Sequence, residues 1–107
     1  MGETTLVALL AALAGDLEGA LLRPSDDATE VVVGEVVVAV VAHASLEVRL
    51  RPAVADAALR TPDVGPSDRG RGWVRFAPSV LDDFARDRAV AWLESAVRLA
   101  VEAAARA

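Results

Sequence analysis

Leucines recur at helical spacing over the first part of the chain. They stand at Leu6, Leu10, Leu13, Leu17 and Leu21. Steps of three and four residues place side chains on one face of an α-helix. The pattern therefore predicts a first helix that is capped by Thr4 or Thr5 and ends near Leu22, followed by an exposed loop over Arg23–Asp27.

A long helix is predicted at the C-terminal end, with Ser79 as its cap and Asp82 at the capping-box position. Its apolar stripe consists of Leu81, Ala85, Ala89, Trp92, Ala96 and Ala100. The carboxylates of Asp82, Asp83 and Asp87 could serve as acid–base groups or as ligands of a hard cation. Capping and complementarity to the helix dipole account for them better.

The residues between these helices have the pattern of β-strands. Val31–Val33 and Val36–Val41 are β-branched runs, and Gly34-Glu35 between them favours a tight turn. Because Val36–Val41 is apolar on both pleat faces, it suits the middle of a sheet. From Leu46 to Arg51 apolar and charged residues alternate, which predicts one buried and one solvent-exposed face.

The second half continues with Pro52, which suits the first turn of a short helix through Arg60. Thr61–Gly72 is predicted to be a loop, and Trp73–Phe76 a last strand. We therefore expect one α+β domain over residues 1–107, a single-layer antiparallel sheet packed with helices in the order α-β-β-β-α-β-α.

Composition and charge narrow the functional classes. Hydrophobic residues make up 54% of the chain and aromatic residues only 4%, so the core is built from Val, Leu and Ala. The apolar stripe of the first helix is wider than a narrow seam, and the valine run is apolar on both faces. This surplus of apolar surface predicts a homodimer. The net charge of −5 arises within residues 1–30, and an acidic protein is unsuited to non-specific binding of nucleic acid or an anionic membrane.

Several other classes are disfavoured by what the sequence lacks. There is no cysteine, which excludes disulfides, thiolate metal sites and a cysteine nucleophile. Leu6–Ala14 is too short to span a bilayer, and Glu3 stands where a signal peptide carries positive charge. We expect a cytoplasmic protein with no membrane partner, no metal and no cofactor.

Two segments carry a family resemblance. They are Val33–Ala39 with Ala42-His43 and Leu46–Leu50 after it, and Gly72–Phe76 before the long C-terminal helix. In them the chain resembles the small luciferase domain-like proteins, a family of unknown function that is distantly similar to the YjbR/MmcQ-like domains. The resemblance covers roughly residues 30–100 and implies an α+β fold but no agreed reaction. The double-wing DNA-binding role suggested for the YjbR-like relatives fits poorly with this chain's acidity and lack of lysine.

Four side chains form the candidate ligand-binding patch. Arg49 and Arg51 alternate with apolar residues on one strand, and Trp73 and Arg75 do so on another. In a shared sheet they emerge on one exposed face, where arginine can stack on an aromatic ring or bind an anion. The structural alternative is a face whose arginines pair with Glu47 or are covered by a second subunit.

His43 is the only histidine, and no HxxH, HxxE or GxSxG pattern accompanies it. A turn or strand-end histidine is the favoured interpretation, although a lone imidazole in a ligand site could transfer a proton or form a hydrogen bond. The Gly65–Gly72 loop carries arginines that could cradle a phosphate. Because it lacks a GK[ST] motif and a following helix, it is interpreted as a surface connection.

These observations favour a non-enzymatic interaction domain that forms a homodimer. One alternative is a binder of a small anionic or aromatic ligand through the arginine–tryptophan patch, and another is a weak nucleic-acid-binding domain. Enzyme activity is the least favoured, because the sequence contains no legible nucleophile–base pair or metal set.

Overall fold

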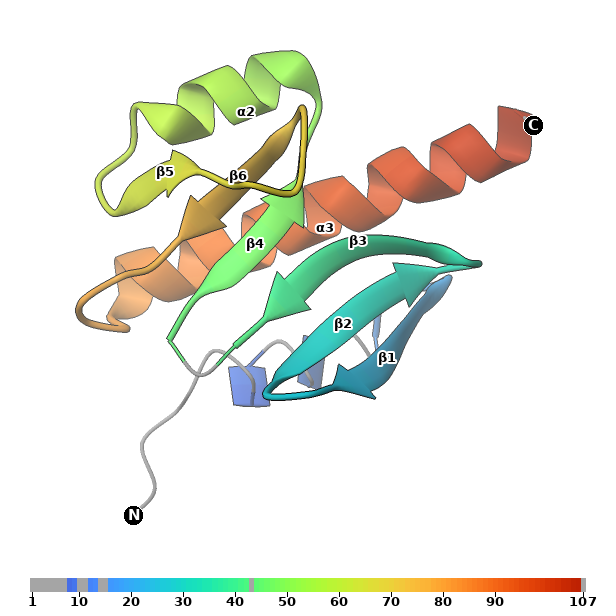
Figure 1. The fold of residues 1–107 in the computed structure, drawn as a ribbon, viewed down its shortest axis with the longest axis horizontal. Helices are drawn as coiled ribbons and strands as arrows, with labels where there is room; N and C mark the ends of the chain where they lie inside the picture. The colour runs from blue at the N-terminus through green and yellow to red at the C-terminus, as the bar shows by residue number, and fades with distance from the viewer. Residues whose placement is uncertain (1–7, 10–11, 14–15, 43, 107) are drawn as a thin grey trace.

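The computed structural model describes residues 8–9, 12–13, 16–42 and 44–106. Its elements are β1 (Ala20–Ser25), β2 (Ala28–Val33), β3 (Val36–Val41), β4 (Leu46–Arg49), α2 (Pro52–Leu59), β5 (Val64–Pro66), β6 (Trp73–Phe76) and α3 (Asp83–Arg106). The six strands form one antiparallel sheet in the order β1-β2-β3-β4-β6-β5. Figure 1 shows α3 behind this sheet and α2 beside β5 and β6. The predicted α+β class and antiparallel sheet are confirmed.

The core lies between α3 and one face of the sheet. From α3 it includes Ala85, Ala89, Trp92, Leu93, Ala96 and Val97, all of which are buried. The alanines allow the helix to approach the sheet closely, and Trp92 fills much of the remaining volume. Its ring meets that of Phe76 edge-on, with the centroids 5.1 Å apart. The predicted apolar stripe is confirmed at Ala85, Ala89, Trp92 and Ala96, whereas Ala100 is only partly buried and Leu81 packs against the core from before the helix.

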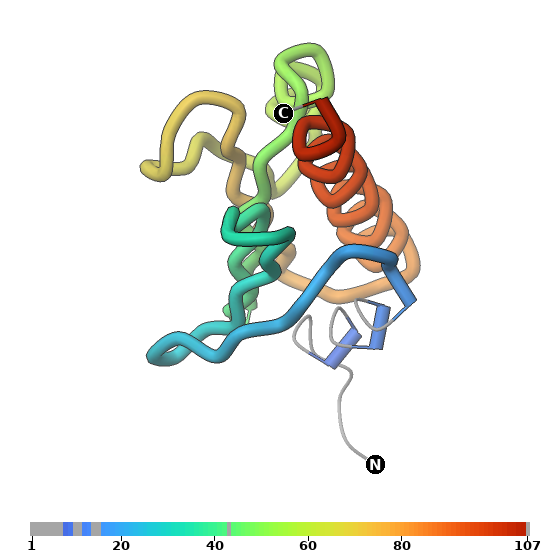
Figure 2. The backbone as a smooth tube through the Cα atoms, turned by 90° about the vertical axis from the view of Figure 1, so that its right-hand side faces the viewer, coloured from blue at the N-terminus to red at the C-terminus, as the bar shows by residue number. Residues whose placement is uncertain are grey.

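Among the described residues, no helix lies over the other face of the sheet (Figure 2). Figure 2 shows the sheet edge-on, with α3 on one side and the loop between β5 and β6 on the other. We call the face turned away from α3 the outer face. Val32 and Val40 point to it and are buried, although they are not part of the cluster beneath α3. Predicting Val36–Val41 to lie in mid-sheet is therefore correct, since β3 is flanked by β2 and β4.

The predicted first helix is wrong at its C-terminal end, and so is the order α-β-β-β-α-β-α. Residues 20–25 form β1, which pairs with β2 along its whole length, and the complete elements begin with strands. Gly19 ends any continuation of a helix because its φ is +91°. A Cβ at Gly19 would lie 3.1 Å from Val101 Cγ2, so the chain turns there against α3.

The described residues include part of the predicted first helix. Residues 8, 9, 12 and 13 are helical, whereas Thr4, Thr5 and Leu6 lie outside the described residues. The predicted Arg23–Asp27 loop shrinks to a turn at Asp26 and Asp27. Pro24 is accommodated in β1 because an edge strand tolerates a residue without a backbone N–H.

Two more boundaries differ from the prediction. Val64–Pro66, which was predicted as loop, forms the edge strand β5 and pairs with β6; a three-residue strand with glycine and proline carries no alternating signal. The long helix begins at Asp83 because Asp82, not Ser79, caps it. The Ala85 N–H donates to Asp82 Oδ1 over 2.9 Å.

Replacing the cap should weaken the protein measurably. We expect Asp82→Ala to lower the free energy of unfolding by about 1 kcal/mol, because it leaves a first-turn N–H without its side-chain acceptor. Urea denaturation at neutral pH measures this, with Ser79→Ala as the matched control that should change little. A larger loss for Ser79→Ala than for Asp82→Ala would contradict the assignment of the cap.

Candidate functional site

The outer face of β4 and β6 carries the candidate patch. Val48 and Val74 point into the core, so their neighbours in each strand point outward. The register places Arg49 opposite Trp73 and Glu47 opposite Arg75, and directly opposed residues project to the same face. The predicted side chains Arg49, Trp73 and Arg75 therefore do share one surface.

Arg51 does not belong to this patch. The strand ends at Arg49, and Arg51 precedes Pro52 at the start of α2. Its guanidinium group pairs with the carboxylate of Glu102 on α3, on the helix side of the sheet. The alternation that predicted Arg51 on the outer face fails because the backbone leaves the strand. His43 lies outside the described residues.

A hydrogen-bonded network centred on Glu47 ties the β5–β6 loop to the outer face. Ser67 Oγ donates to Glu47 Oε2 over 2.6 Å, and Arg69 Nε donates to Glu47 Oε1 over 3.0 Å. The Arg69 backbone N–H donates to Ser67 Oγ. The guanidinium carbon of Arg69 also lies 5.8 Å from the centre of the Trp73 ring. In Figure 1 this loop crosses in front of the sheet.

This network lowers the pKa of Glu47. Burial alone raises the pKa of this half-buried carboxyl, but hydrogen bonds from Ser67 and Arg69 act in the opposite direction. The positive charges of Arg69 and Arg75 act in the same direction as those hydrogen bonds, so the pKa lies below its ordinary value. Glu47 is therefore an anchoring carboxylate and not a candidate general acid at neutral pH.

Sequence reasoning missed Ser67 and Arg69. The cation over Trp73 comes from the loop rather than from Arg49 or Arg75, and the pairing with Glu47 that was expected of strand arginines is made by Arg69. The sequence signal that could have indicated them was the glycine loop with its arginines. Which of these arginines reaches back to β4 depends on the path of the loop, and a local sequence pattern does not predict that path.

A hollow lies beside the patch, where β4 gives way to α2. Its volume is about 600 Å³, and it is lined by Arg49, Leu50, Arg51, Pro52, Ala53, Arg71, Gly72 and Leu99. We call it the arginine hollow, because three guanidinium-bearing residues from different segments line it. Two of them, Arg49 and Arg51, were predicted ligand-binding residues, whereas Arg71 belongs to the glycine loop that was considered as a phosphate cradle but interpreted as a surface connection.

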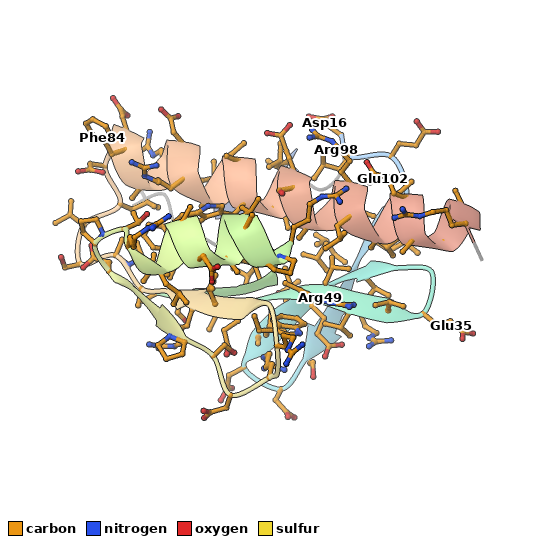
Figure 3. All side chains as sticks on the ribbon, turned by 90° about the horizontal axis from the view of Figure 1, so that it is seen from above. Asp16, Glu35, Arg49, Phe84, Arg98 and Glu102 are labelled. Atoms are coloured by element: carbon orange, nitrogen blue, oxygen red, sulfur yellow. The ribbon has the colours of Figure 1, made fainter. Side chains whose placement is uncertain are left out.

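The N-terminal end of α3 has a different character. Phe84 is 76% exposed and Val80 is 68% exposed. Phe84 lies between two hollows of about 370 and 340 Å³ and lines both. Figure 3 shows Phe84 and Glu102 near opposite ends of α3, so this apolar surface is remote from the arginine hollow.

Within the described part of the chain, no group of three or more histidine, aspartate or glutamate side chains is arranged to hold a metal ion. In that same part, no helix is long and apolar enough to cross a membrane.

Removing the Glu47 carboxylate should destabilise the protein in a pH-dependent way. We expect Glu47→Gln to lower the free energy of unfolding by about 1 kcal/mol at pH 7. Because the folded pKa of Glu47 is lowered, its contribution is complete above the ordinary value of 4.5 and is lost as the pH falls through the folded pKa. Urea denaturation across this range should show the difference from wild type shrinking in acid. The exposed Glu35→Gln is the control, and an equal effect there would contradict the role of the network.

No protein-family model, curated protein or solved structure matches this chain. Any inference about its function therefore rests on the chain's own side chains.

Proposed function

We propose that this chain is a non-enzymatic interaction domain that forms a homodimer through the N-terminal half of α3. The observation that carries the proposal is the exposure of Phe84 on a helix whose opposite side is buried in the core. Phe84 is three-quarters exposed, so burying its side chain against a second subunit would stabilise the dimer by about 2 kcal/mol. Exposed aromatic side chains of this kind are enriched at subunit interfaces.

The spacing of side chains on this helix face is self-complementary. Phe84, Asp87, Arg88 and Ala91 follow each other at steps of three, one and three residues and are all exposed. In a two-fold antiparallel pair of α3 helices centred between residues 87 and 88, Asp87 faces Arg88 of the partner subunit. Phe84 then faces Ala91 of the partner subunit, and both contacts occur twice because the interface is isologous.

The charges on this face support that geometry. The side chains of Asp87 and Arg88 take part in no hydrogen bond or ion pair within residues 16–42 and 44–106. Neighbouring Arg86, by contrast, pairs with Asp83 on its own helix. In the dimer, Asp87 of each copy is paired with the opposite charge of Arg88 of the partner subunit.

Shape points to the same contact. Phe84, Asp87, Arg88, Ala91 and Trp92 line the hollow of about 340 Å³. The small side chain of Ala91 leaves room for a ring beside Trp92, so Phe84 of each copy can fill the hollow of the other. This gives the interface an aromatic anchor at each end with charged pairs between the anchors.

A charge-swap experiment tests the geometry directly. We expect Asp87→Arg and Arg88→Asp each to dissociate the dimer, because each variant juxtaposes like charges across the two-fold axis. An equimolar mixture of the two variants should dimerise again, because every pair across the axis is then oppositely charged. Sedimentation velocity at micromolar concentrations measures the three samples. A mixture that stays monomeric while the wild type dimerises would contradict this interface.

Truncating the aromatic anchor should weaken the same dimer. We expect Phe84→Ser to raise the dimer dissociation constant by at least about tenfold, equivalent to 1.4 kcal/mol or more. Leu21→Thr is the matched control, since Leu21 is 68% exposed but lies on β1. A wild-type protein that sediments as a monomer would remove the proposal altogether.

A further inference from the structure

The arginine hollow gathers positive charge from three segments of the chain. Arg49 comes from the end of β4, Arg51 from the start of α2 and Arg71 from the β5–β6 loop. Sequence neighbours contribute only part of this set, because Arg71 is twenty residues away from Arg51. The hollow is therefore assembled by the fold.

Gly72 fixes Arg71 at this position. The Leu50 N–H donates to the Gly72 carbonyl over 2.8 Å, which locks the loop against the end of β4. A Cβ on Gly72 would lie 2.8 Å from the Leu50 carbonyl oxygen, and its φ of +84° also favours glycine. The loop can therefore come close enough to the strand to place Arg71 beside it only because residue 72 has no side chain.

The charge in the hollow is not neutralised. Arg51 pairs with Glu102, but Arg49 and Arg71 take part in no ion pair or hydrogen bond among the side chains that the structure describes. Of the three guanidinium groups that line the hollow, only that of Arg51 has a carboxylate partner among the described side chains. Such groups bind phosphate oxygens through two parallel N–H donors each, which makes an unpaired set selective for a multiply charged anion.

The start of α2 adds to this field. The helix has no side-chain cap and no acidic residue in its first turn. Pro52 has no N–H, and the Ala55 N–H donates to the Arg51 carbonyl. The N–H groups of Ala53 and Val54 are therefore the ones without an intrahelical acceptor. Ala53 of this turn lines the hollow. The helix end supplements the arginines, which supply most of the positive charge.

The remaining lining is apolar. Leu50, Pro52 and Leu99 face the hollow with Ala53, and none of them offers a hydrogen-bonding side chain. A ligand that satisfies both parts of the lining carries its charge at one end and an apolar group at the other. We propose that the arginine hollow binds a phosphate monoester attached to a small apolar group, with Arg49 and Arg71 as its principal phosphate ligands.

Phenyl phosphate is the probe, and isothermal titration calorimetry is the measurement. The wild type should bind phenyl phosphate saturably, bind inorganic phosphate more weakly because it lacks the apolar group, and not bind phenol. Arg49→Ala with Arg71→Ala should weaken phenyl phosphate binding at least about tenfold. Arg60→Ala with Arg106→Ala removes the same net charge from exposed positions elsewhere and should leave it within about twofold.

A gain of affinity provides a second test that a misfolded variant cannot imitate. Glu102→Gln removes the carboxylate that holds Arg51, so a third guanidinium becomes available and phenyl phosphate should bind several-fold more tightly. Phe84→Ser should bind phenyl phosphate like the wild type, which separates this site from the dimer. The proposal is overturned if the wild type shows no saturable binding at millimolar phenyl phosphate, or if Arg49→Ala with Arg71→Ala behaves like the control pair.

Discussion

The packing of α3 against one face only of the sheet is the constraint on which the rest of the structure depends. Ala85, Ala89 and Ala96 keep the helix close to the inward valines, and Ala55 and Ala58 of α2 belong to the same buried cluster. No second helix covers the outer face in the described residues, so exposed charged side chains there are solvated, and only a partly buried one such as Glu47 needs partners from the protein. The Glu47 network meets this requirement, because a carboxylate on a half-buried sheet face is stable only with donors around it.

The loop that satisfies Glu47 also delivers the positive charge of the arginine hollow. Arg69 pairs with Glu47 and covers Trp73, whereas Arg71, two residues later, is left without a carboxylate. The hydrogen bond between Leu50 and Gly72 holds the chain at the end of β4. Arg71 therefore lies beside the hollow, whereas Arg69 lies over Glu47. Arginines of nearly adjacent sequence thus have different tasks, one structural and one available for a ligand.

Sequence patterns predicted those elements whose side chains alternate or repeat around a single buried surface. The alternation Leu46–Arg49, the paired strands around Gly34 and the apolar stripe of α3 follow from burial on one side. The first helix was overextended because Leu21 keeps the helical spacing while Gly19 ends it. Arg51 was misplaced because period-two alternation continues in the sequence past the point where the strand stops. Within the site, Arg49, Trp73 and Arg75 could be predicted from strand register, whereas Arg69 and Arg71 depend on the path of a loop.

The acidity of the chain does not argue against a small anionic ligand, although it does argue against a polyanion. The excess of negative charge lies within residues 1–30, and the remainder of the chain is balanced. Screening confines an exposed charge to about 8 Å at physiological ionic strength, so a ligand in the arginine hollow responds mainly to Arg49, Arg71 and the pair of Arg51 with Glu102. A nucleic acid extends far beyond that distance and meets the acidic surface as well. Local charge, and not net charge, therefore decides which anions this fold can bind.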